Sequence, residues 1–297
     1  MSEDDPRRPP FARGTRGLDP GGRRRSAPLH IGPGGRSKSA PLDFGPSAPG
    51  TRVIYGVGPV REVVTRRAAN VKAVWVDPHR TGRSARDPVA DIVFAARAAN
   101  IRVDDRDRAS LDRAAEGLHQ GVVAWLGPFE YADLDALLVD APALVVMLDG
   151  VEDPRNLGAV LRSAYLLGAG GVIIPEHRAA QVTAVVAKSS AGASELVPIA
   201  CVGNLARTLG ELRERGLWRV AVHASEGAQP IEQIDGTLPL CLVLGAEGSG
   251  VRPLVAKSCD FHAVIPMTRT AVGSFNVSVA ASIALYEIRR QRIGAAK

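Results

Sequence analysis

Three segments of the chain place polar side chains directly after an apolar run, and chemistry is expected there. Residues 148–158 read LDGVEDPRNLG, and Arg162 lies six residues after Asn156 on an otherwise apolar stretch. Helix capping accounts for an Asp, a Pro and an Asn at a helix start, but it does not account for this arginine. A fixed guanidinium can polarise a hydroxyl group and can hold a phosphate.

The second segment is rich in glycine. Residues 244–250 read LGAEGSG, and its three glycines let the backbone approach a ligand closely around the carboxylate of Glu247. The spacing is not the G-x-G-x-x-G of a dinucleotide site, and Pro253 argues against a helix directly after it. Taken alone, the segment is equally consistent with an ordinary tight turn.

The third segment precedes the last helix of the chain. Residues 265–278 contain Ser274 and Asn276, which are residue types that cap helix N-termini. In an open α/β sheet, ligands bind beyond the carboxyl ends of the strands. We therefore expect the three segments to meet at one edge of a sheet.

The elements that must position these segments alternate between strand and helix. We expect apolar strands at 144–148, 171–174, 218–223, 240–244 and 263–265, and helices at 158–167, 204–215 and 276–292. Strands that are apolar throughout indicate a parallel sheet covered on both faces.

The residues before this sheet divide into three parts. Residues 1–50 are rich in Arg, Pro, Gly and Ser and are expected to form a disordered basic arm, which either contacts phosphates or is a solvated tail. Residues 51–127 form a smaller α/β domain with expected strands at 52–56, 72–77, 101–103 and 121–126 and helices at 60–69, 89–100 and 108–118. Residues 128–142 are expected to be a linker to a domain over 143–297.

Composition limits the class of protein. The length of 297 residues is enough for two domains, and the hydrophobic fraction of 45% is enough to form their cores. The net charge of +6 favours a polyanionic partner such as RNA. The three cysteines lack the spacing of a disulfide framework or a zinc site, and we expect no metal. No apolar run reaches the roughly 18 residues of a membrane helix, and we expect no secretory signal because residues 3–5 are acidic and no apolar stretch follows them. These features predict a cytoplasmic protein without a membrane segment.

Taken together, the three segments resemble a known family. "LDGVEDPRNLGAVLRSA", "LVLGAEGSGV" and "IPM…GSFNVSVAASIALYE", in this order, resemble the three motifs of the SpoU/TrmH methyltransferases of the SPOUT superfamily. "IYGVGPVREVV" and "LHQGVVAWL" resemble the L30e-like substrate-binding domain found before the catalytic domain in the branch that methylates a guanosine of 23S rRNA. The resemblance implies a trefoil-knotted α/β catalytic domain, a homodimer and ribose 2′-O-methylation of RNA with S-adenosyl-L-methionine.

The resemblance also implies which residues bind the cofactor. Gly245, Ile265 and Phe275 match positions that contact it, and their neighbours Leu244, Gly250 and Met267 are expected to complete the site. The family usually has Leu where Phe275 stands, and the loop 268–273 is one residue longer than is common there, so the adenosyl site is expected to differ in shape.

For the reaction, Arg162 matches the family's catalytic arginine. A guanidinium keeps its proton at ordinary pH, so we expect it to act electrostatically beside the 2′-oxygen rather than as a base. Glu247 then orients Arg162 or accepts the proton, while Asn156, Ser274 and Asn276 position the ribose and brace the loops.

Other functions remain open at this point. The nearest is a tRNA 2′-O-methyltransferase, which the L30e-like domain disfavours because the tRNA branch generally lacks it. A non-catalytic RNA-binding or ribosome-assembly factor on the same fold is disfavoured by the intact polar residues. A nicotinamide-dependent dehydrogenase would need its glycine-rich turn after the first strand, and the order here is wrong.

Overall fold

The computed structural model describes most of the chain after the N-terminal arm, namely residues 51–80, 87–115, 117–139, 144–269 and 273–295. The expected basic arm over 1–50 lies outside the described residues. Across the ranges just given, no helix is long and apolar enough to span a membrane.

The first sheet has four strands in the order β1-β4-β2-β3. Strand β4 runs antiparallel to both β1 and β2, while β2 and β3 are parallel. The strands are β1 (Arg52–Tyr55), β2 (Val71–Val76), β3 (Arg102–Asp105) and β4 (Val122–Leu126), and the helices are α1 (Val57–Arg66), α2 (Pro88–Ala98) and α3 (Arg108–Ala114).

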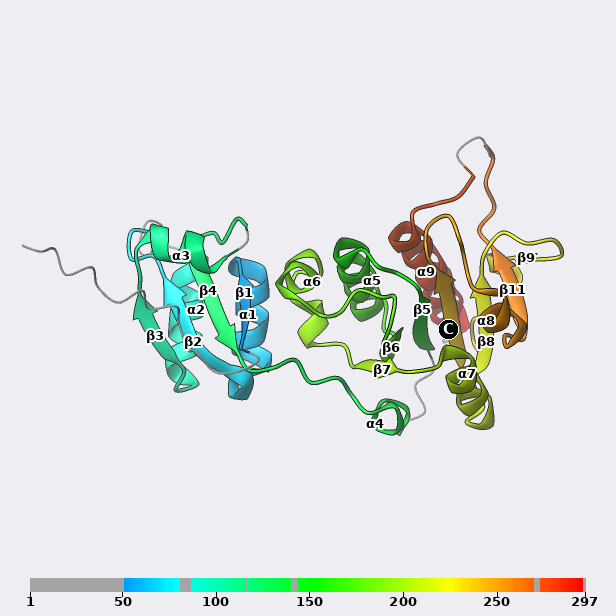
Figure 1. Ribbon diagram of the computed structural model, residues 1–297, viewed down its shortest axis with the longest axis horizontal. Coiled ribbons are helices and arrows are strands. Elements are labelled where there is room, and N and C mark those ends of the chain that lie inside the picture. Colours follow the sequence, from blue (N-terminus) through cyan, green and yellow to red (C-terminus); the bar gives the residue numbers. More distant parts are fainter. Residues whose placement is uncertain (1–50, 81–86, 116, 140–143, 270–272, 296–297) are drawn as a thin grey trace, which may run out of the picture. The chain divides into compact units, whose positions relative to one another are not determined.

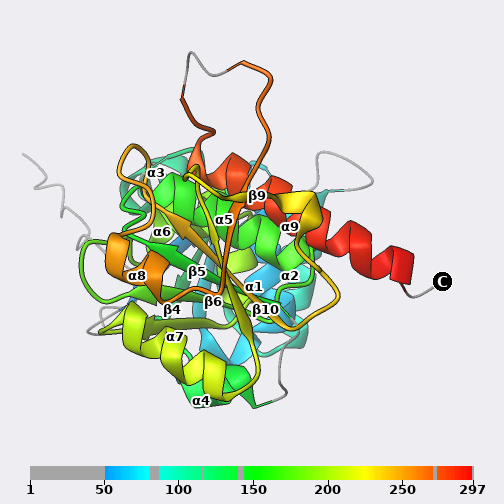
Figure 2. The same cartoon turned by 90° about the vertical axis from the view of Figure 1, so that its right-hand side faces the viewer.

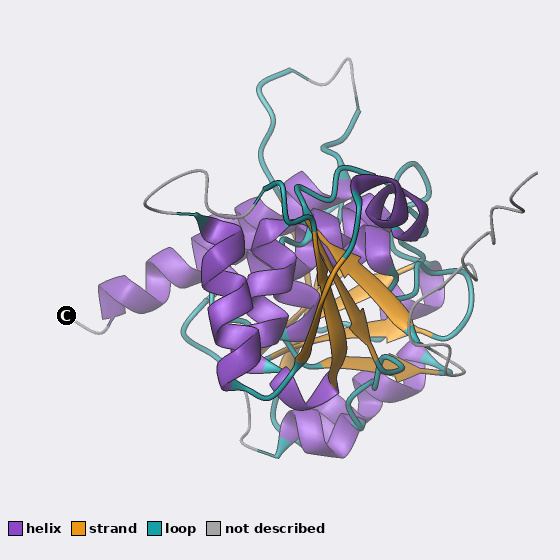
Figure 3. Ribbon diagram, turned by 90° about the vertical axis from the view of Figure 1, so that its left-hand side faces the viewer, coloured by secondary structure: helices purple, strands orange, loops and turns teal. Residues whose placement is uncertain are grey.

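Helices cover both faces of this sheet (Figure 3). Ile54 and Val74 point to the face covered by α1 and α2, whereas Tyr55 and Trp75 point to the face covered by α3. This alternation of side chains along each strand is the period of two that a sheet requires. Trp75 also packs edge-on against Trp125, with ring centroids 4.9 Å apart.

The segment expected to be a linker contains structure of its own. Leu134–Leu138 form the short helix α4, which begins where Asp133 accepts a hydrogen bond from the amide of Asp135. Phe129 and Tyr131 pack against the core of the following sheet. The described part of this segment is therefore partly apolar and packs against the second sheet.

The second sheet has seven strands in the order β7-β6-β5-β10-β8-β11-β9, and each neighbouring pair is parallel. The predicted parallel sheet is therefore confirmed. The strands are β5 (Leu144–Asp149), β6 (Gly171–Pro175), β7 (Ile199–Val202), β8 (Trp218–Val222), β9 (Gln229–Pro230), β10 (Leu240–Gly245) and β11 (Phe261–Val264). The helices are α5 (Pro154–Leu166), α6 (Ala184–Ser189), α7 (Leu205–Glu214), α8 (Pro253–Lys257) and α9 (Val277–Ala295).

Helices cover both faces of this sheet (Figures 1 and 2), and apolar side chains pack between them and the strands. Leu144, Val146 and Leu148 of β5 pack with residues of α5 and α9, while Val145 and Met147 pack with residues of α4, α7 and α8. All of these side chains are buried, and this explains why the central strands are apolar without alternation.

Two helices depart from the sequence-based expectation. Helix α5 begins at Pro154 rather than at residue 158, because the carboxylate of Asp153 accepts a hydrogen bond from the amide of Arg155 at 2.7 Å. Asn156 is therefore inside the helix and is not its cap. The expectation of no helix after the glycine segment was wrong: α8 begins at Pro253, because a first helical position needs no N–H donor.

Strand β7 and helix α6 were not predicted. They span four and six residues, too short for a periodic pattern to stand out.

Candidate active site

The three polar segments meet at the carboxyl edge of the second sheet. They follow β5, β10 and β11, and in the β5–β10 register Asp149 lies directly beside Gly245. In chain order β10 is the sixth of the seven strands, but in the sheet it lies between β5 and β8. This position brings the glycine segment next to the first polar segment. The expected convergence of these segments is therefore present.

Hydrogen bonds join one residue from each segment. The Nδ2 group of Asn156 donates to Oε1 of Glu247 at 2.9 Å. The Nδ2 group of Asn276 donates to Oδ1 of Asn156 at 3.1 Å and also to Oε1 of Glu247. The sequence placed these residues 91 and 120 positions apart from Asn156, and the fold brings them into one cluster. We call Asn156, Glu247 and Asn276 the polar cluster.

Asn276 also fixes the start of the last helix. Its Oδ1 accepts hydrogen bonds from the amide of Ser278 at 2.9 Å and from the Ser278 hydroxyl at 2.6 Å. The capping role expected from its residue type is thus present. Because its amide nitrogen bonds to Glu247 at the same time, Asn276 couples the start of α9 to the glycine segment.

A cavity of about 520 Å³ lies beside the polar cluster, between the ends of β8, β10 and β11 and the start of α9. All six residues expected to bind the cofactor line it: Leu244, Gly245, Gly250, Ile265, Met267 and Phe275. Glu247 and Ser274 line it as well, so the carboxylate of the cluster reaches its rim. Its volume lies within the range of roughly 300–1,000 Å³ that is usual for small-molecule sites.

Gly245 is required by close packing of the backbone. A Cβ atom at this position would lie 1.9 Å from the carbonyl carbon of Gly250 and 2.2 Å from the amide nitrogen of Val251. The glycine segment therefore folds back on the end of β10, where Ala246 and Gly250 form an isolated bridge. Only a residue without a side chain permits this turn, and the turn forms one wall of the cavity.

A buried ion pair holds the end of the same segment, and the sequence reasoning missed it. The side chain of Asp149 is 0% exposed, and its two oxygens accept hydrogen bonds from the backbone amide of Arg252 at 2.8 Å and from its Nε at 2.6 Å. A buried carboxylate needs such partners, because removing a charged group from water has a large free-energy cost. The available signal was a charged residue closing an otherwise apolar strand.

Arg162 lies apart from the polar cluster. Its side chain is exposed on α5, lines neither of the two large cavities at this edge, and has no ion pair with Glu247 or with any other residue that the structure describes. It shares a helix face with Tyr165 and Leu166, which are also exposed. The electrostatic role of Arg162 therefore stays a prediction. Ser274 lines the cavity, and its positioning role stays a prediction too.

A histidine pair borders the cavity and was not among the predicted site residues. Nε2 of His223, at the end of β8, lies 2.8 Å from Nδ1 of His262 in β11, and His223 lines the cavity. Burial, and secondarily the neighbouring His262, lowers the pKa of His223 below its ordinary value. One ring must donate and the other accept, so at least one of the two imidazoles carries an unprotonated nitrogen in this pair.

In the described ranges, no group of three or more His, Cys, Asp or Glu side chains could hold a metal ion. The three cysteines are free thiols. Burial raises the pKa of the Cys259 thiol to about 12, which makes it a poor nucleophile.

Comparison with known proteins identifies the fold and the family. Residues 143–286 match the model of the SpoU rRNA Methylase family, and residues 53–132 match the model for RNA 2′-O ribose methyltransferase substrate binding. The chain is 43% identical to the 23S rRNA (guanosine-2′-O-)-methyltransferase RlmB of Pseudomonas putida, over 80% of this chain and 96% of that protein. The chain belongs to the SpoU rRNA methylase family. The resemblance read from the three motifs is therefore confirmed.

Other SpoU relatives agree in sequence and in structure. The putative TrmH family tRNA/rRNA methyltransferase YacO of Bacillus subtilis is 43% identical over 68% of this chain and 82% of its own length. The SpoU methyltransferase AviRb of Streptomyces viridochromogenes, solved in complex with the cofactor AdoMet, superposes with a TM-score of 0.68 at 25% identity, covering 82% of this chain and 92% of that one.

Proposed function

We propose that this protein transfers a methyl group from S-adenosyl-L-methionine to the ribose 2′-oxygen of a guanosine in 23S rRNA. The observation that carries the proposal is the polar cluster at the rim of the glycine-walled cavity, because it unites all three family motifs. The substrate is the one that the name of the Pseudomonas relative gives, and the match covers 96% of that relative.

The residues around the cavity fit this cofactor. Gly245 lets the glycine segment fold back on the end of β10, so that backbone forms this wall of the cavity, and a backbone wall can bond the edge of an adenine. Ile265 and Phe275 offer apolar surfaces for the ring, and Phe275 remains 39% exposed on the cavity side of the loop before α9. Bound S-adenosylmethionine would supply an electrophilic sulfonium methyl group.

The chain's own residues would then prepare the 2′-hydroxyl. Two amide groups fix the Glu247 carboxylate through Oε1, which leaves Oε2 to accept the hydroxyl proton. Ser274, on the same rim, would position the ribose. Arg162 would stabilise the negative charge that develops on the 2′-oxygen, since a guanidinium keeps its own proton.

We further propose that the protein acts as a homodimer. Arg162, Tyr165 and Leu166 are exposed on α5, and Val279 and Tyr286 are exposed on α9, which contacts α5. A second protomer on this face would bury the apolar side chains and exclude water from around Arg162, which strengthens its charge. The isolated position of Arg162 in one chain supports this arrangement.

The remaining architectural proposals concern the chain path and the first domain. We propose that the catalytic domain, residues 143–297, is knotted, which is supported by the insertion of β10 between β5 and β8. We propose that residues 51–127 form an L30e-like domain that binds the RNA, with 128–142 as the connection, which is supported by the substrate-binding match over 53–132. We also propose a cytoplasmic location, which an rRNA substrate supports.

Mapping of ribose methylation in cells with and without the gene tests this function. We expect loss of the gene to remove the 2′-O-methyl group from a guanosine of 23S rRNA and to leave tRNA unchanged. Loss of a methyl group from tRNA instead would assign the protein to the alternative tRNA activity. An unchanged map would contradict the enzymatic proposal.

A further inference from the structure

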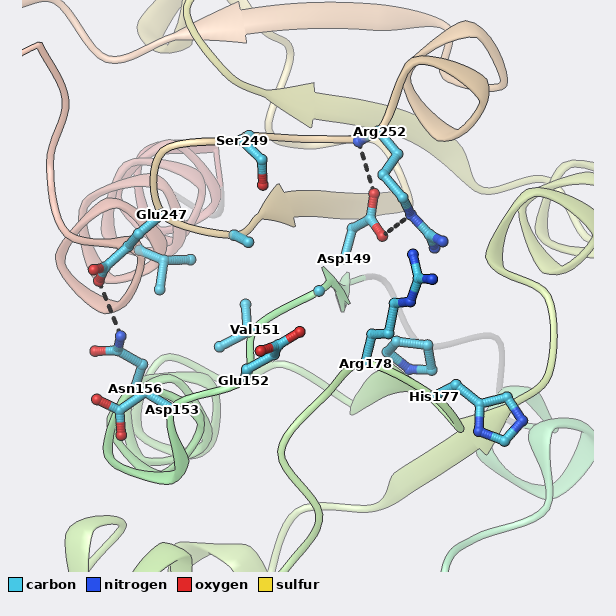
Figure 4. A pocket seen from close by; sticks show the side chains of 15 residues that line it. Asp149, Val151, Glu152, Asp153, Asn156, His177, Arg178, Glu247, Ser249 and Arg252 are labelled. Carbon is cyan, nitrogen blue, oxygen red and sulfur yellow. Dashed lines mark hydrogen bonds and ion pairs between the residues drawn. The ribbon is translucent and has the colours of Figure 1, made fainter.

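A second cavity, of about 530 Å³, lies beside the cofactor cavity at the same edge of the sheet. The two share residues of the glycine segment, including Glu247 and Gly250, and the second cavity extends from there to the ends of β5 and β6. Figure 4 shows Asn156 and Glu247 at one end of it and Arg178 and Arg252 at the other. The proposed reaction site therefore opens into a cavity with a cationic far end.

Arg252 is held rigidly at this far end. Its backbone amide and Nε both donate to Asp149, whose side chain is wholly buried. The bond from Nε occupies the inner edge of the guanidinium. Its two terminal nitrogens have no partner among the described residues, and the side chain is 56% exposed.

Arg178 faces Arg252 from the segment after β6. Figure 4 shows its guanidinium turned toward Asp149 and Arg252, whereas the neighbouring His177 points away. Its backbone has φ of 55°, a left-handed conformation that is uncommon for a residue with a side chain. Within the ranges described, no ion pair joins Arg178 to Glu152, a carboxylate that also lines the cavity.

Two guanidiniums turned toward one another repel unless an anion lies between them. Both oxygens of the buried Asp149 carboxylate bind Arg252, and among the described residues Arg178 forms no ion pair with Asp149. The planar donor edges of arginine suit the oxygens of a phosphate. We propose that Arg178 and Arg252 together bind a backbone phosphate of the RNA strand, next to the nucleotide whose ribose is methylated.

This inference rests on the proposed RNA substrate and adds a specific contact to it. The phosphate would be held at the cationic end while the ribose lies against the polar cluster at the other end. Arg178 and Arg252 would thus fix the register of the strand, and the polar cluster would meet the 2′-hydroxyl of a single nucleotide.

The variant Arg178→Gln tests the contact, because it removes the charge and leaves the Asp149–Arg252 pair in place. The matched control is Arg213→Gln, since Arg213 is exposed in the last turn of α7, at the opposite edge of the sheet from the cavity. The probe is an in vitro transcript of 23S rRNA, and its dissociation constant is measured between 50 and 200 mM salt, roughly the range over which counterion release dominates.

We expect Arg178→Gln to weaken RNA binding about 10- to 100-fold, as for a lost hydrogen bond to a charged group. The slope of log affinity against log salt should fall by about 0.7–0.9, the value of one phosphate contact. Arg213→Gln should match the wild type. Equal slopes for the two variants would overturn the inference, even if the wild-type protein methylates the transcript.

A chemical change in the RNA locates the contact. With the methylated nucleotide mapped, a neutral methylphosphonate replaces the phosphate on either side of it, in a short RNA. At one of the two positions the wild type should lose affinity as Arg178→Gln does, and combining both changes should add less than about twofold. Fully additive losses at both positions would overturn the inference.

The same variant separates this site from the cofactor. Arg178 does not line the cofactor cavity, so the affinity for S-adenosylmethionine should be unchanged in Arg178→Gln. If cofactor affinity falls instead while RNA binding is kept, the two arginines hold the carboxylate of the cofactor, and the phosphate assignment is wrong. RNA binding is measured independently of turnover, so a protein that binds RNA through Arg178 but transfers no methyl group would contradict only the proposed function.

Discussion

Replacing Gly245 with alanine tests whether the turn of the glycine segment builds the cofactor site. The new Cβ would lie 1.9 Å from the carbonyl carbon, and 2.1 Å from the oxygen, of Gly250. Ordinary contacts for a Cβ atom begin near 3.4 Å. The backbone of the segment must therefore move outward by roughly 1.5 Å, and no side-chain rotation can relieve the clash.

The ion pair at the end of the segment resists this movement. Displacing the segment strains the two hydrogen bonds from Arg252 to the buried Asp149, and bonds to charged groups contribute about 1.5–3 kcal/mol each. Loss of one such bond, or a distortion of the cavity wall with the same free-energy cost, corresponds to a 10- to 100-fold higher dissociation constant for the cofactor. We expect Gly245→Ala to bind S-adenosylmethionine at least about 10-fold more weakly than the wild type.

Isothermal titration with S-adenosylmethionine measures this loss, and thermal unfolding in the absence of ligand checks that the fold is kept. Gly248→Ala is the matched control: it lies in the same segment at φ of 79°, and a Cβ there meets nothing within 4 Å. Its cost is limited to the left-handed backbone, about 1–2 kcal/mol, and falls mainly on stability. Wild-type affinity in Gly245→Ala would refute the reasoning.

Two further predictions concern the reaction and its pH dependence. Arg162→Lys keeps the charge but loses the planar fork, so single-turnover methyl transfer to an rRNA fragment should fall about 10²–10³-fold while cofactor affinity is unchanged; wild-type turnover would remove Arg162 from the mechanism. The pKa of His223 is lowered in the folded protein by burial and by His262, from an ordinary value of 6.5. The unfolded chain therefore binds this proton more readily, so the contribution to stability is present above pH 6.5 and is lost as the pH falls toward the folded pKa. As the pH is lowered from neutral, the thermal unfolding midpoint should decrease less steeply in His223→Asn than in the wild type. Parallel curves of midpoint against pH would show that this pair does not control the pH response.

The sequence predicted the carboxyl-edge site because its polar residues directly follow apolar strands. Glu247 and Asn276 could be expected near Asn156, since parallel strands end at a common edge. The hydrogen bonds among them depend on β10 lying between β5 and β8, an order that no local pattern reveals. Residues of the glycine segment were recognised from composition, because only glycine permits the close approach at Gly245.

Other parts could not be read from the sequence, for identifiable reasons. The pairing of Asp149 with Arg252 spans 103 positions, so the charge that closes an apolar strand was visible in the sequence but its partner was not. Arg178 looks like any exposed arginine after a strand, and its importance arises only from the side chains that it faces. The position of Arg162 away from the polar cluster depends on the path of α5, which begins four residues earlier than its apolar pattern suggests.

Methyl transfer to purified RNA tests the central claim most directly. The protein is incubated with S-adenosylmethionine carrying a labelled methyl group and with 23S rRNA from cells that lack the gene, and the labelled nucleotide is identified after alkaline hydrolysis, which a 2′-O-methyl group blocks. The account predicts label in an alkali-resistant dinucleotide that begins with a single guanosine, lost in Arg162→Lys and weakened in Arg178→Gln. Label on a base, or label that appears only when tRNA is supplied, would contradict it.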